Sequence, residues 1–217
     1  MNKIYHLFEK IFRTCNRYIL RKKLRNKDFS LITNTCVGGI MCHELGVRFL
    51  SPMVNVGFED KDFPKFAKNL RWYMQQPLKF IDTNEPWPVA YCGDILMHFV
   101  HYHTIRDAEE KWYARRKRIN YNNLFFICGD RTDFNRENGV ITYEDIASLK
   151  EIPCKGKVVF SIRHYDDIDY IFPLPKDPNG DFIHPYTSDR SKILRKWSWE
   201  GNFDYVHWFN TGEVKHC

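Results

Sequence analysis

The segment Asn34–Gly39, with the sequence Asn-Thr-Cys-Val-Gly-Gly, joins a predicted strand to a predicted short helix. In open α/β sheets, ligands bind beyond the carboxyl ends of the strands, and a helix N-terminus offers free N–H groups to phosphate. Gly38 and Gly39 would let the backbone approach such a ligand closely. We therefore predict that Asn34, Gly38 and Gly39 bind phosphate. The segment matches neither the GxGxxG nor the P-loop pattern, and the alternative is a tight turn that requires glycine.

Cys36 directly precedes the same helix, where the helix dipole can lower the pKa of a thiol and favour the nucleophilic thiolate. A Cys–His pair with His98 or His101 would then suit nucleophilic catalysis. The alternative is a small buried cysteine with a structural role.

A second candidate lies in the segment from Gly93 to His103. Asp94 begins it and could deprotonate a hydroxyl or bind a sugar. Strand alternation would place His101 and His103 on one face and His98 on the other. Two histidines without a third ligand do not make a zinc site. We predict Asp94, His98 and His101 as catalytic residues and no metal ligand.

The third candidate is an aromatic and arginine cluster at the end of a charged helix. Trp112 and Arg115 are one helical turn apart, and Arg118 and Asn120 follow. Arginines beside an aromatic ring suit a pyrophosphate and a stacked base. The alternatives are a solvated helix face and cations that stabilise a helix C-terminus.

Short strands and helices alternate along the chain that must position these residues. This alternation predicts an α/β fold, a single three-layer domain with a mainly parallel or mixed sheet. The expected strands are 29–35, 78–81, 89–92, 95–102, 124–128 and 157–162, and the expected helices are 40–45, 62–76, 105–119 and 142–149. From residue 163 a proline-rich stretch weakens the pattern, and 203–210 is the last expected ordered element.

Residues 1–28 form a basic segment ahead of the predicted domain at 29–217. The segment holds nine Lys or Arg and two Asp or Glu, a net charge of +7, so that the rest of the +6 chain carries −1. Apolar side chains recur every three or four residues, at Ile4, Leu7, Phe8, Ile11, Phe12, Cys15, Tyr18 and Ile19. This spacing predicts an amphipathic helix.

A bulky apolar stripe beside a basic face is typical of a helix that lies on an anionic membrane surface. Each basic residue near anionic lipid adds about 1 kcal/mol of attraction. The alternatives are a helix whose apolar face packs on the domain and an arm for nucleic acid or another partner. We predict no nucleic-acid binding, because a nucleic-acid face would spread its charge over the fold.

The cysteines and the hydropathy pattern indicate where the protein works. Seven scattered cysteines without a CxxC pair favour reduced thiols in a cytosol. The sequence has no run of about 18 apolar residues, so we expect no membrane span. The prediction is a cytoplasmic protein, peripheral on the inner membrane face.

Taken together, these segments resemble a bacterial family of undefined biochemical activity whose members are commonly labelled exopolysaccharide or capsule biosynthesis proteins. The resemblance covers roughly Phe29 to Asn210. It rests on ITNTCVGGIMCHELG (Ile32–Gly46), SPMVNVGF (Ser51–Phe58), DILMHFVHY (Asp94–Tyr102), EKWYARRKRINYNNLF (Glu110–Phe125) and FDYVHWFN (Phe203–Asn210). The resemblance implies an α/β fold and a role in a polysaccharide gene cluster, without an agreed mechanism.

The resulting hypothesis is a transferase of surface-polysaccharide assembly, of glycosyltransferase type. It would use a nucleotide sugar, with Mg²⁺ or Mn²⁺ as the expected metal, and a lipid-linked acceptor. Two segments, Asp60-Lys-Asp62 and Asp167-Ile-Asp169, have the DxD spacing of a metal-binding motif but lie in weak contexts. The alternatives are an acyl transferase or hydrolase that uses Cys36 and a histidine, and a non-catalytic membrane-docked accessory protein.

Overall fold

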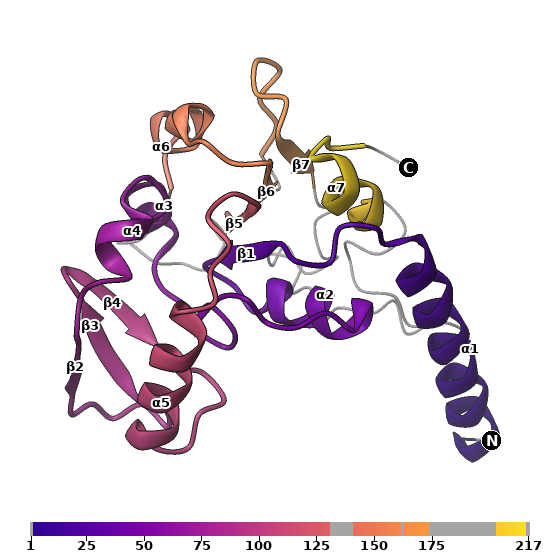
Figure 1. Ribbon diagram of the computed structural model, residues 1–217, viewed down its shortest axis with the longest axis horizontal. Coiled ribbons are helices and arrows are strands. Elements are labelled where there is room, and N and C mark those ends of the chain that lie inside the picture. Colours follow the sequence, from indigo (N-terminus) through magenta and orange to yellow (C-terminus); the bar gives the residue numbers. More distant parts are fainter. Residues whose placement is uncertain (1, 131–140, 162, 174–202, 216–217) are drawn as a thin grey trace.

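The computed structural model describes residues 2–130, 141–161, 163–173 and 203–215, which form a mixed α/β fold with two sheets (Figure 1). The strands are β1 (Ser30–Thr33), β2 (Leu78–Ile81), β3 (Val89–Cys92), β4 (Ile95–His98), β5 (Leu124–Gly129), β6 (Gly156–Ser161) and β7 (Ile171–Pro173). The α-helices are α1 (Asn2–Lys23), α2 (Val37–Leu45), α3 (Phe63–Lys68), α4 (Leu70–Tyr73), α5 (Ile105–Arg116), α6 (Tyr143–Ser148) and α7 (Tyr205–Thr211). Two 3₁₀ turns, η1 (Asp60–Asp62) and η2 (Leu149–Glu151), complete the described elements.

The four-stranded sheet is parallel, with the order β1-β5-β6-β7. Every residue of β5 is buried, because helices cover both faces of this sheet. Phe126 and Val159 face the core that contains α3 and α6, whereas Phe125 and Phe160 face the core that contains α2 and α7. The predicted α/β class and its three layers are therefore confirmed.

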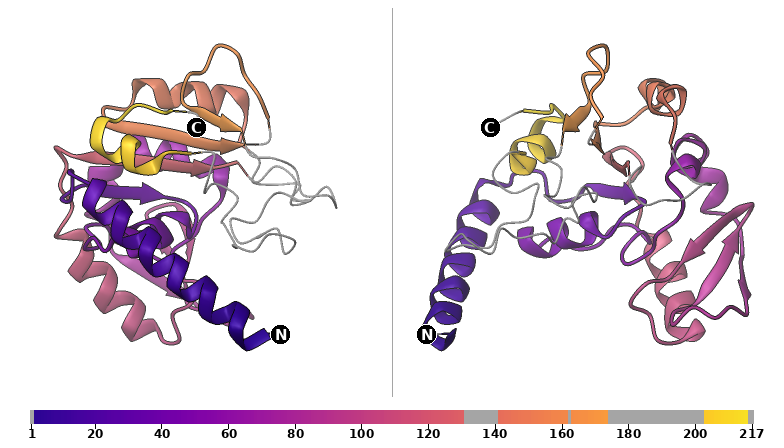
Figure 2. Two further views of the ribbon diagram at one scale, coloured as in Figure 1. Left: turned by 90° about the vertical axis from the view of Figure 1, so that its right-hand side faces the viewer. Right: turned by 180° about the vertical axis from the view of Figure 1, so that it is seen from behind.

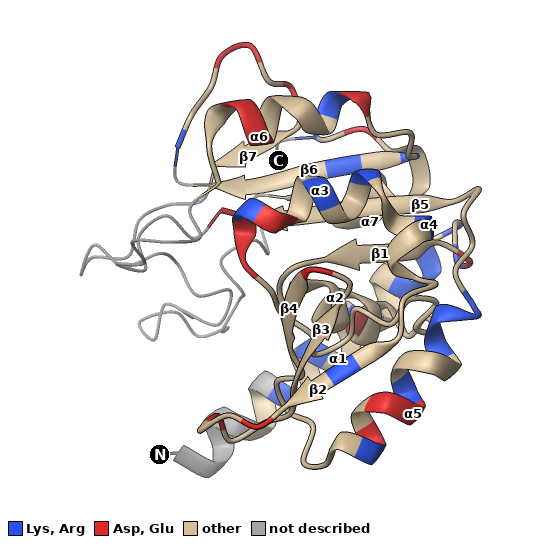
Figure 3. Ribbon diagram, turned by 90° about the vertical axis from the view of Figure 1, so that its left-hand side faces the viewer, with Lys and Arg blue, Asp and Glu red and all other residues tan. Residues whose placement is uncertain are grey.

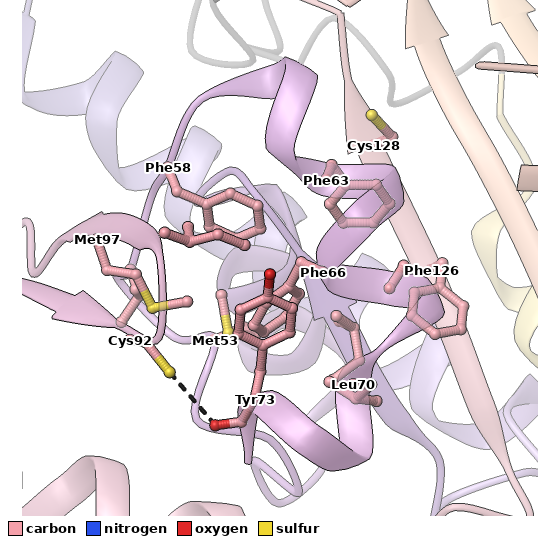
Figure 4. Close-up of a cluster of buried hydrophobic side chains, with 14 of the residues drawn as sticks. Met53, Phe58, Phe63, Phe66, Leu70, Tyr73, Cys92, Met97, Phe126 and Cys128 are labelled. Atoms are coloured by element: carbon pink, nitrogen blue, oxygen red, sulfur yellow. Dashed lines mark hydrogen bonds between the residues drawn. The ribbon is translucent and has the colours of Figure 1, made fainter. Parts of the chain in front are cut away.

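The larger core joins the two sheets. Figure 4 shows aromatic side chains from α3 and α4 packed between β5 and the antiparallel sheet. Phe66 lies 5.0 Å from Phe58 and 5.1 Å from Tyr73, measured between ring centroids. The Cys92 thiol donates to the carbonyl of Tyr73 at 3.3 Å. These contacts fix the antiparallel sheet on one side of the parallel sheet.

The antiparallel sheet has the order β2-β3-β4. The strand predicted over 95–102 is too long, because β4 ends at His98 and His101 has a positive φ of 73°. The chain turns there, with the Tyr102 N–H donating to the Phe99 carbonyl at 3.0 Å. The turn buries both of these rings in one core, 5.8 Å apart, whereas an extended strand would point them to opposite faces. The alternation predicted beyond His98 is therefore wrong.

Several local predictions are confirmed. Gly46 ends α2 in the left-handed conformation, with φ 65°. Thr142 and Asp145 form a reciprocal capping box at the start of α6. Asp62 precedes α3 but makes no side-chain cap hydrogen bond, which differs from the sequence prediction. The last predicted element is helix α7, and much of the proline-rich stretch, residues 174–202, lies outside the described residues.

Helix α1 extends from one corner of the molecule, as Figures 1 and 2 show. Leu24, directly after the helix, is buried in the core beneath α2 and α7, and Leu20 packs on the same core. No helix in the described ranges is long and apolar enough to cross a bilayer.

Candidate functional site at the carboxyl edge of the parallel sheet

Asn34 directly follows β1 and is completely buried. Its Oδ1 accepts a hydrogen bond from the Gly129 N–H at 2.9 Å, and its Nδ2 donates to the Gly129 carbonyl at 3.2 Å. The side chain thus continues the ladder between β1 and β5 beyond the last residue of β1. Of the residues predicted from the sequence, Asn34 is held most rigidly at the edge where α/β sheets bind ligands.

Asp60 approaches Asn34 from the turn η1. Asn34 Nδ2 donates to Asp60 Oδ1 at 2.6 Å, and the Asp60 side chain is buried. The short bond fixes the orientation of the Asp60 carboxyl group beside the amide. This carboxylate belongs to a DxD-like segment noted in the sequence.

Gly129 ends β5 beneath the side chain of Thr35. A Cβ atom at Gly129 would lie 2.5 Å from Thr35 Cγ2, which is closer than real atoms approach. Thr35 is itself positioned by the hydroxyl of Thr33, which accepts from the Thr35 N–H at 3.1 Å. A side chain at position 129 would therefore displace the side chain of Thr35.

Asp130 follows Gly129 and is completely buried. Its Oδ2 accepts from Ser161 Oγ at 2.5 Å and from Arg163 Nε at 2.8 Å. The Arg163 guanidinium also donates to the Ile141 carbonyl at 2.6 Å, and its side chain remains 28% exposed. Two buried acceptors therefore fix a partly exposed cation at the carboxyl ends of β5 and β6.

Cys36 precedes α2 at the same edge and is partly exposed. Burial raises the pKa of the Cys42 and Cys92 thiols to about 12, so these two thiols stay protonated. Cys36 is the cysteine of this edge whose exposure suits reaction with a reagent from solvent.

Gly38 and Gly39 lie in the first turn of α2. A Cβ at Gly38 would meet Thr33 Cγ2 at 2.8 Å, so glycine lets the helix pack closely on β1. Both glycines line a shallow, mostly apolar hollow between α2, β1 and residues 49–54, with a cavity volume of only about 10 Å³. Close helix–strand packing therefore accounts for Gly38 without a phosphate.

Asp94 lies in the turn between β3 and β4, on the antiparallel sheet. Lys65 Nζ donates to its Oδ2 at 2.9 Å, and the Tyr73 hydroxyl donates to its Oδ1 at 2.8 Å. Hydrogen bonds from Lys65 and Tyr73 lower the pKa of the Asp94 carboxyl. This exposed, ion-paired carboxylate is a weaker base than an ordinary aspartate, which does not favour the predicted role in deprotonation.

The two predicted catalytic histidines lie in different surroundings. Backbone hydrogen bonds pair His98, at the end of β4, with Gly57. A Cβ atom at Gly57 would lie 3.6 Å from the Asn34 carbonyl. The end of β4 therefore lies close to the carboxyl edge of the parallel sheet. His98 Nδ1 accepts from Trp87 Nε1 at 3.4 Å. His101 lies in the exposed turn beyond β4.

The predicted cluster on α5 separates in the structure. Trp112 is buried, with its ring 5.9 Å from Phe99, so it is not accessible for stacking on a base. Arg115 donates to the Tyr102 hydroxyl at 2.7 Å and lies over the ring of Phe49. Figure 3 shows basic and acidic residues interleaved along α5, consistent with a solvated, ion-paired face.

Asn120 lies at the opposite edge of the parallel sheet from Asn34. Its N–H donates to Ser30 Oγ at 2.7 Å, and its Nδ2 donates to the Asp28 carbonyl at 3.1 Å. Ser30 and Asn34 are four residues apart on an extended strand, which is roughly 13 Å. Exposed Arg118 follows α5 just before Asn120. Neither residue is brought to the carboxyl edge.

The described residues at the carboxyl edge therefore form a polar cluster of Asn34, Cys36, Asp60, Asp130, Ser161 and Arg163. Nowhere in the described ranges do three or more His, Cys, Asp or Glu side chains gather as metal ligands would. The cluster offers a fixed cation, an amide and buried carboxylates, which suit a polar ligand with phosphate or hydroxyl groups. Sequence reasoning missed Asp130, Ser161 and Arg163, although Asp130 directly follows β5, Ser161 ends β6 and Arg163 lies two residues beyond it.

Fold and site together define an α/β protein with a polar cluster at the carboxyl edge of a parallel sheet. Residues 7–210 match the family described as a domain of unknown function, DUF1919, and the chain belongs to this family. It is 33% identical over 198 residues to an uncharacterized protein of Haemophilus influenzae, with 88% of each chain covered. The family description assigns no reaction and makes no connection to polysaccharide or capsule synthesis.

Proposed function

We propose that this protein is a transferase of surface-polysaccharide assembly, of glycosyltransferase type, that works at the cytoplasmic face of the membrane. Its donor would be a nucleotide-activated sugar and its acceptor a lipid-linked saccharide. The observation that carries the proposal is the Arg163 guanidinium, fixed by buried Asp130 at the carboxyl edge of a parallel sheet. The sequence resemblance to polysaccharide-biosynthesis proteins supplies the substrate class.

Arg163 suits the diphosphate of a nucleotide sugar because a guanidinium forms paired hydrogen bonds with phosphate oxygens. Its Nε and one terminal nitrogen are occupied by Asp130 and the Ile141 carbonyl, which fixes the plane of the group. A cation that is already oriented loses little side-chain entropy when the ligand binds. In this proposal Arg163 replaces Arg115 and Arg118 as the phosphate ligand.

Asp60 would contact the sugar beside this phosphate site. The buried Asn34 amide donates to its carboxyl group at 2.6 Å and fixes its orientation. Asp62, the other acid of the DxD-like segment, lies 3.6 Å from Lys65 Nζ. Asp60 alone would therefore contribute to a Mg²⁺ or Mn²⁺ ion, together with phosphate oxygens of the donor.

A thermal-shift screen against nucleotide sugars, with and without Mg²⁺ or Mn²⁺, tests the proposal. A ligand at 100 times its Kd should add about 2.7 kcal/mol of stability and raise the Tm by several degrees. The shift should disappear in Arg163→Met and persist in Arg118→Met, a matched control at the other edge of the sheet. Each variant is compared with its own ligand-free Tm. Equal shifts in both variants, or none in the wild type, would contradict the proposal.

A second candidate function is group transfer or hydrolysis through Cys36. The specific observation is that Cys36 is partly exposed at the start of α2, at the same edge as Asn34. In this case Cys36→Ser, or alkylation of Cys36, would abolish turnover while Arg163→Met kept it. A membrane-docked accessory protein without catalysis would show no nucleotide-sugar shift in any variant.

A further inference from the structure

Helix α1 attaches to the body through its basic face. Arg13, Arg17 and Arg21 are spaced four residues apart and therefore share one side of the helix. All three point to the C-terminal end of α2, where the side chain of Glu44 is buried. The basic side of α1 is thus the side that contacts protein.

Glu44 and the carbonyl groups beside it hold these arginines. Arg17 donates to both carboxylate oxygens of Glu44 at 2.6 Å, and Arg13 lies 3.9 Å from the same group. Arg21 donates to the Glu44 carbonyl at 3.0 Å and to the His43 carbonyl at 3.2 Å. Paired bonds to a planar guanidinium fix the rotation of a helix about its axis as well as its position. We call this set of contacts the Glu44 clamp.

The clamp turns the apolar side of α1 away from the body. At 100° per residue, the centre of the apolar stripe lies about 150° around the helix from Arg13, Arg17 and Arg21, and Phe8 and Ile19 are the most nearly opposite. Leu7 and Phe8 are 58% and 65% exposed. The exposed apolar stripe consists of Leu7, Phe8, Ile11, Phe12, Tyr18 and Ile19. A contiguous stripe of this kind marks an interaction surface, because monomeric proteins rarely expose one.

The charges around the stripe indicate its partner. Lys22 and Lys23 are exposed on α1, and Lys22 Nζ lies 5.6 Å from the centroid of the Tyr18 ring, within the stripe. Lysines that flank bulky apolar side chains complement anionic lipid headgroups above an acyl boundary. A second copy of α1 would instead bring these lysines against each other.

We infer that the exposed stripe of α1 inserts into the headgroup region of an anionic bilayer, with the Glu44 clamp setting the orientation of the protein on that surface. The inference rests on the membrane attachment in the proposed function and specifies its surface. Lysines, and not the clamped arginines, supply the lipid contacts. In the left view of Figure 2, the N-terminal end of α1 and the arrowheads of β6 and β7 lie toward the same side, and in the right view the arrowhead of β1 points away from α1.

Co-sedimentation of the full chain with vesicles tests the surface. The vesicles contain 30% phosphatidylglycerol in phosphatidylcholine, and pure phosphatidylcholine serves as the neutral comparison. The triple variant Phe8→Ser/Ile11→Ser/Phe12→Ser should lose at least about a hundredfold in partition, because each lost apolar group weakens insertion. Its Tm should not fall, since these side chains are exposed in the folded protein. Ile105→Ser, at an exposed apolar position on α5, is the matched control and should bind as the wild type does.

Charge-reversal variants distinguish the contribution of the α1 lysines to lipid binding from that of lysines elsewhere on the protein. Lys22→Glu/Lys23→Glu should weaken binding to the anionic vesicles by more than about 25-fold, since each lysine contributes about fivefold. Lys117→Glu/Lys150→Glu changes the net charge equally at exposed positions of the body and should retain most binding. Equal losses in the two variants would show that net charge alone binds lipid and would overturn the inference.

The vesicle-binding measurement does not depend on whether the protein catalyses the proposed transferase reaction. Donor binding measured by thermal shift should be the same in the triple serine variant and the wild type. Vesicle binding without any thermal shift by nucleotide sugars would support the membrane-binding surface and contradict the proposed transferase function. A nucleotide-sugar shift without vesicle binding would contradict the membrane-binding surface alone. A lipid-free dimer that the serine variant abolishes, together with no vesicle binding by the wild type, would identify a second copy as the occupant.

Discussion

Two carboxylate–cation pairs of this protein have nearly the same length in very different surroundings. Asp130 Oδ2 lies 2.8 Å from Arg163 Nε, and Asp94 Oδ2 lies 2.9 Å from Lys65 Nζ. The Asp130 side chain is 0% exposed, whereas that of Asp94 is 63% exposed. The contact distances alone would rank these pairs as equals.

Their surroundings give the two pairs different roles. Water screens an exposed pair, which contributes about 0–1 kcal/mol to folding, whereas loss of one member of a buried pair leaves an uncompensated charge. Asp130 also accepts from Ser161 and thereby connects two strand ends. The buried pair can hold a group ready for a ligand, while the exposed pair joins the turn between β3 and β4 to α3. The Glu44–Arg17 pair is intermediate, with side chains 5% and 31% exposed.

The largest effect is expected for Asp130→Asn. The substitution removes the charge that holds Arg163 and should lower the free energy of unfolding by about 3 kcal/mol. Urea denaturation at 0.05 M and 0.5 M NaCl measures it, and the loss should be nearly the same at both salt concentrations, because the pair is shielded from counterions. A loss in the free energy of unfolding below about 1 kcal/mol would show that burial does not make the Asp130–Arg163 pair contribute more than the exposed Asp94–Lys65 pair.

An intermediate effect is expected for Glu44→Gln. The amide keeps the shape but loses the paired bonds with Arg17, which should cost about 1–2 kcal/mol. The loss should be concentrated in α1, because the clamp holds that helix to α2. Hydrogen exchange of the α1 amides should accelerate while that of β5 stays unchanged. Equal acceleration in both elements would contradict a clamp that acts on α1 alone.

The smallest effect is expected for Asp94→Asn, below about 1 kcal/mol at low salt and absent at 0.5 M NaCl. Hydrogen bonds from Lys65 and Tyr73 lower the pKa of this carboxyl in the folded state. Its stabilisation is therefore present above the unfolded pKa of about 3.9 and is lost as the pH falls through the lower folded pKa.

Urea midpoints of wild type and Asp94→Asn, compared at pH 7 and near pH 2, test this sign. The two midpoints should differ slightly at pH 7 and converge in acid. A difference that grows in acid would contradict the assignment.

Local patterns in the sequence predicted the elements well where short-range physics decides them. The apolar run of β5, the Gly46 stop of α2 and the Thr142 capping box all depend on residues within one or two turns. The prediction failed beyond His98, where burial of Phe99 and Tyr102 in one core ended the strand. Tertiary packing overrides strand periodicity at that point.

The candidate site was predicted only in part. Asn34 and Cys36 were found because they follow a strand and precede a helix, and both lie at the carboxyl edge. Trp112 and Asn120 follow equally suggestive patterns, yet one is buried in the core and the other binds the start of β1. Asp130 and Arg163 are 33 residues apart, so no local pattern could pair them.

The sequence by itself determined the α/β class, the amphipathic character of residues 1–28 and most strands, because hydrophobic periodicity and capping act over short distances. Only the tertiary structure decided which side of α1 contacts the body and which charged groups meet at the sheet edge. Those outcomes depend on contacts between distant segments, where burial determines whether a charge is paired or left in water.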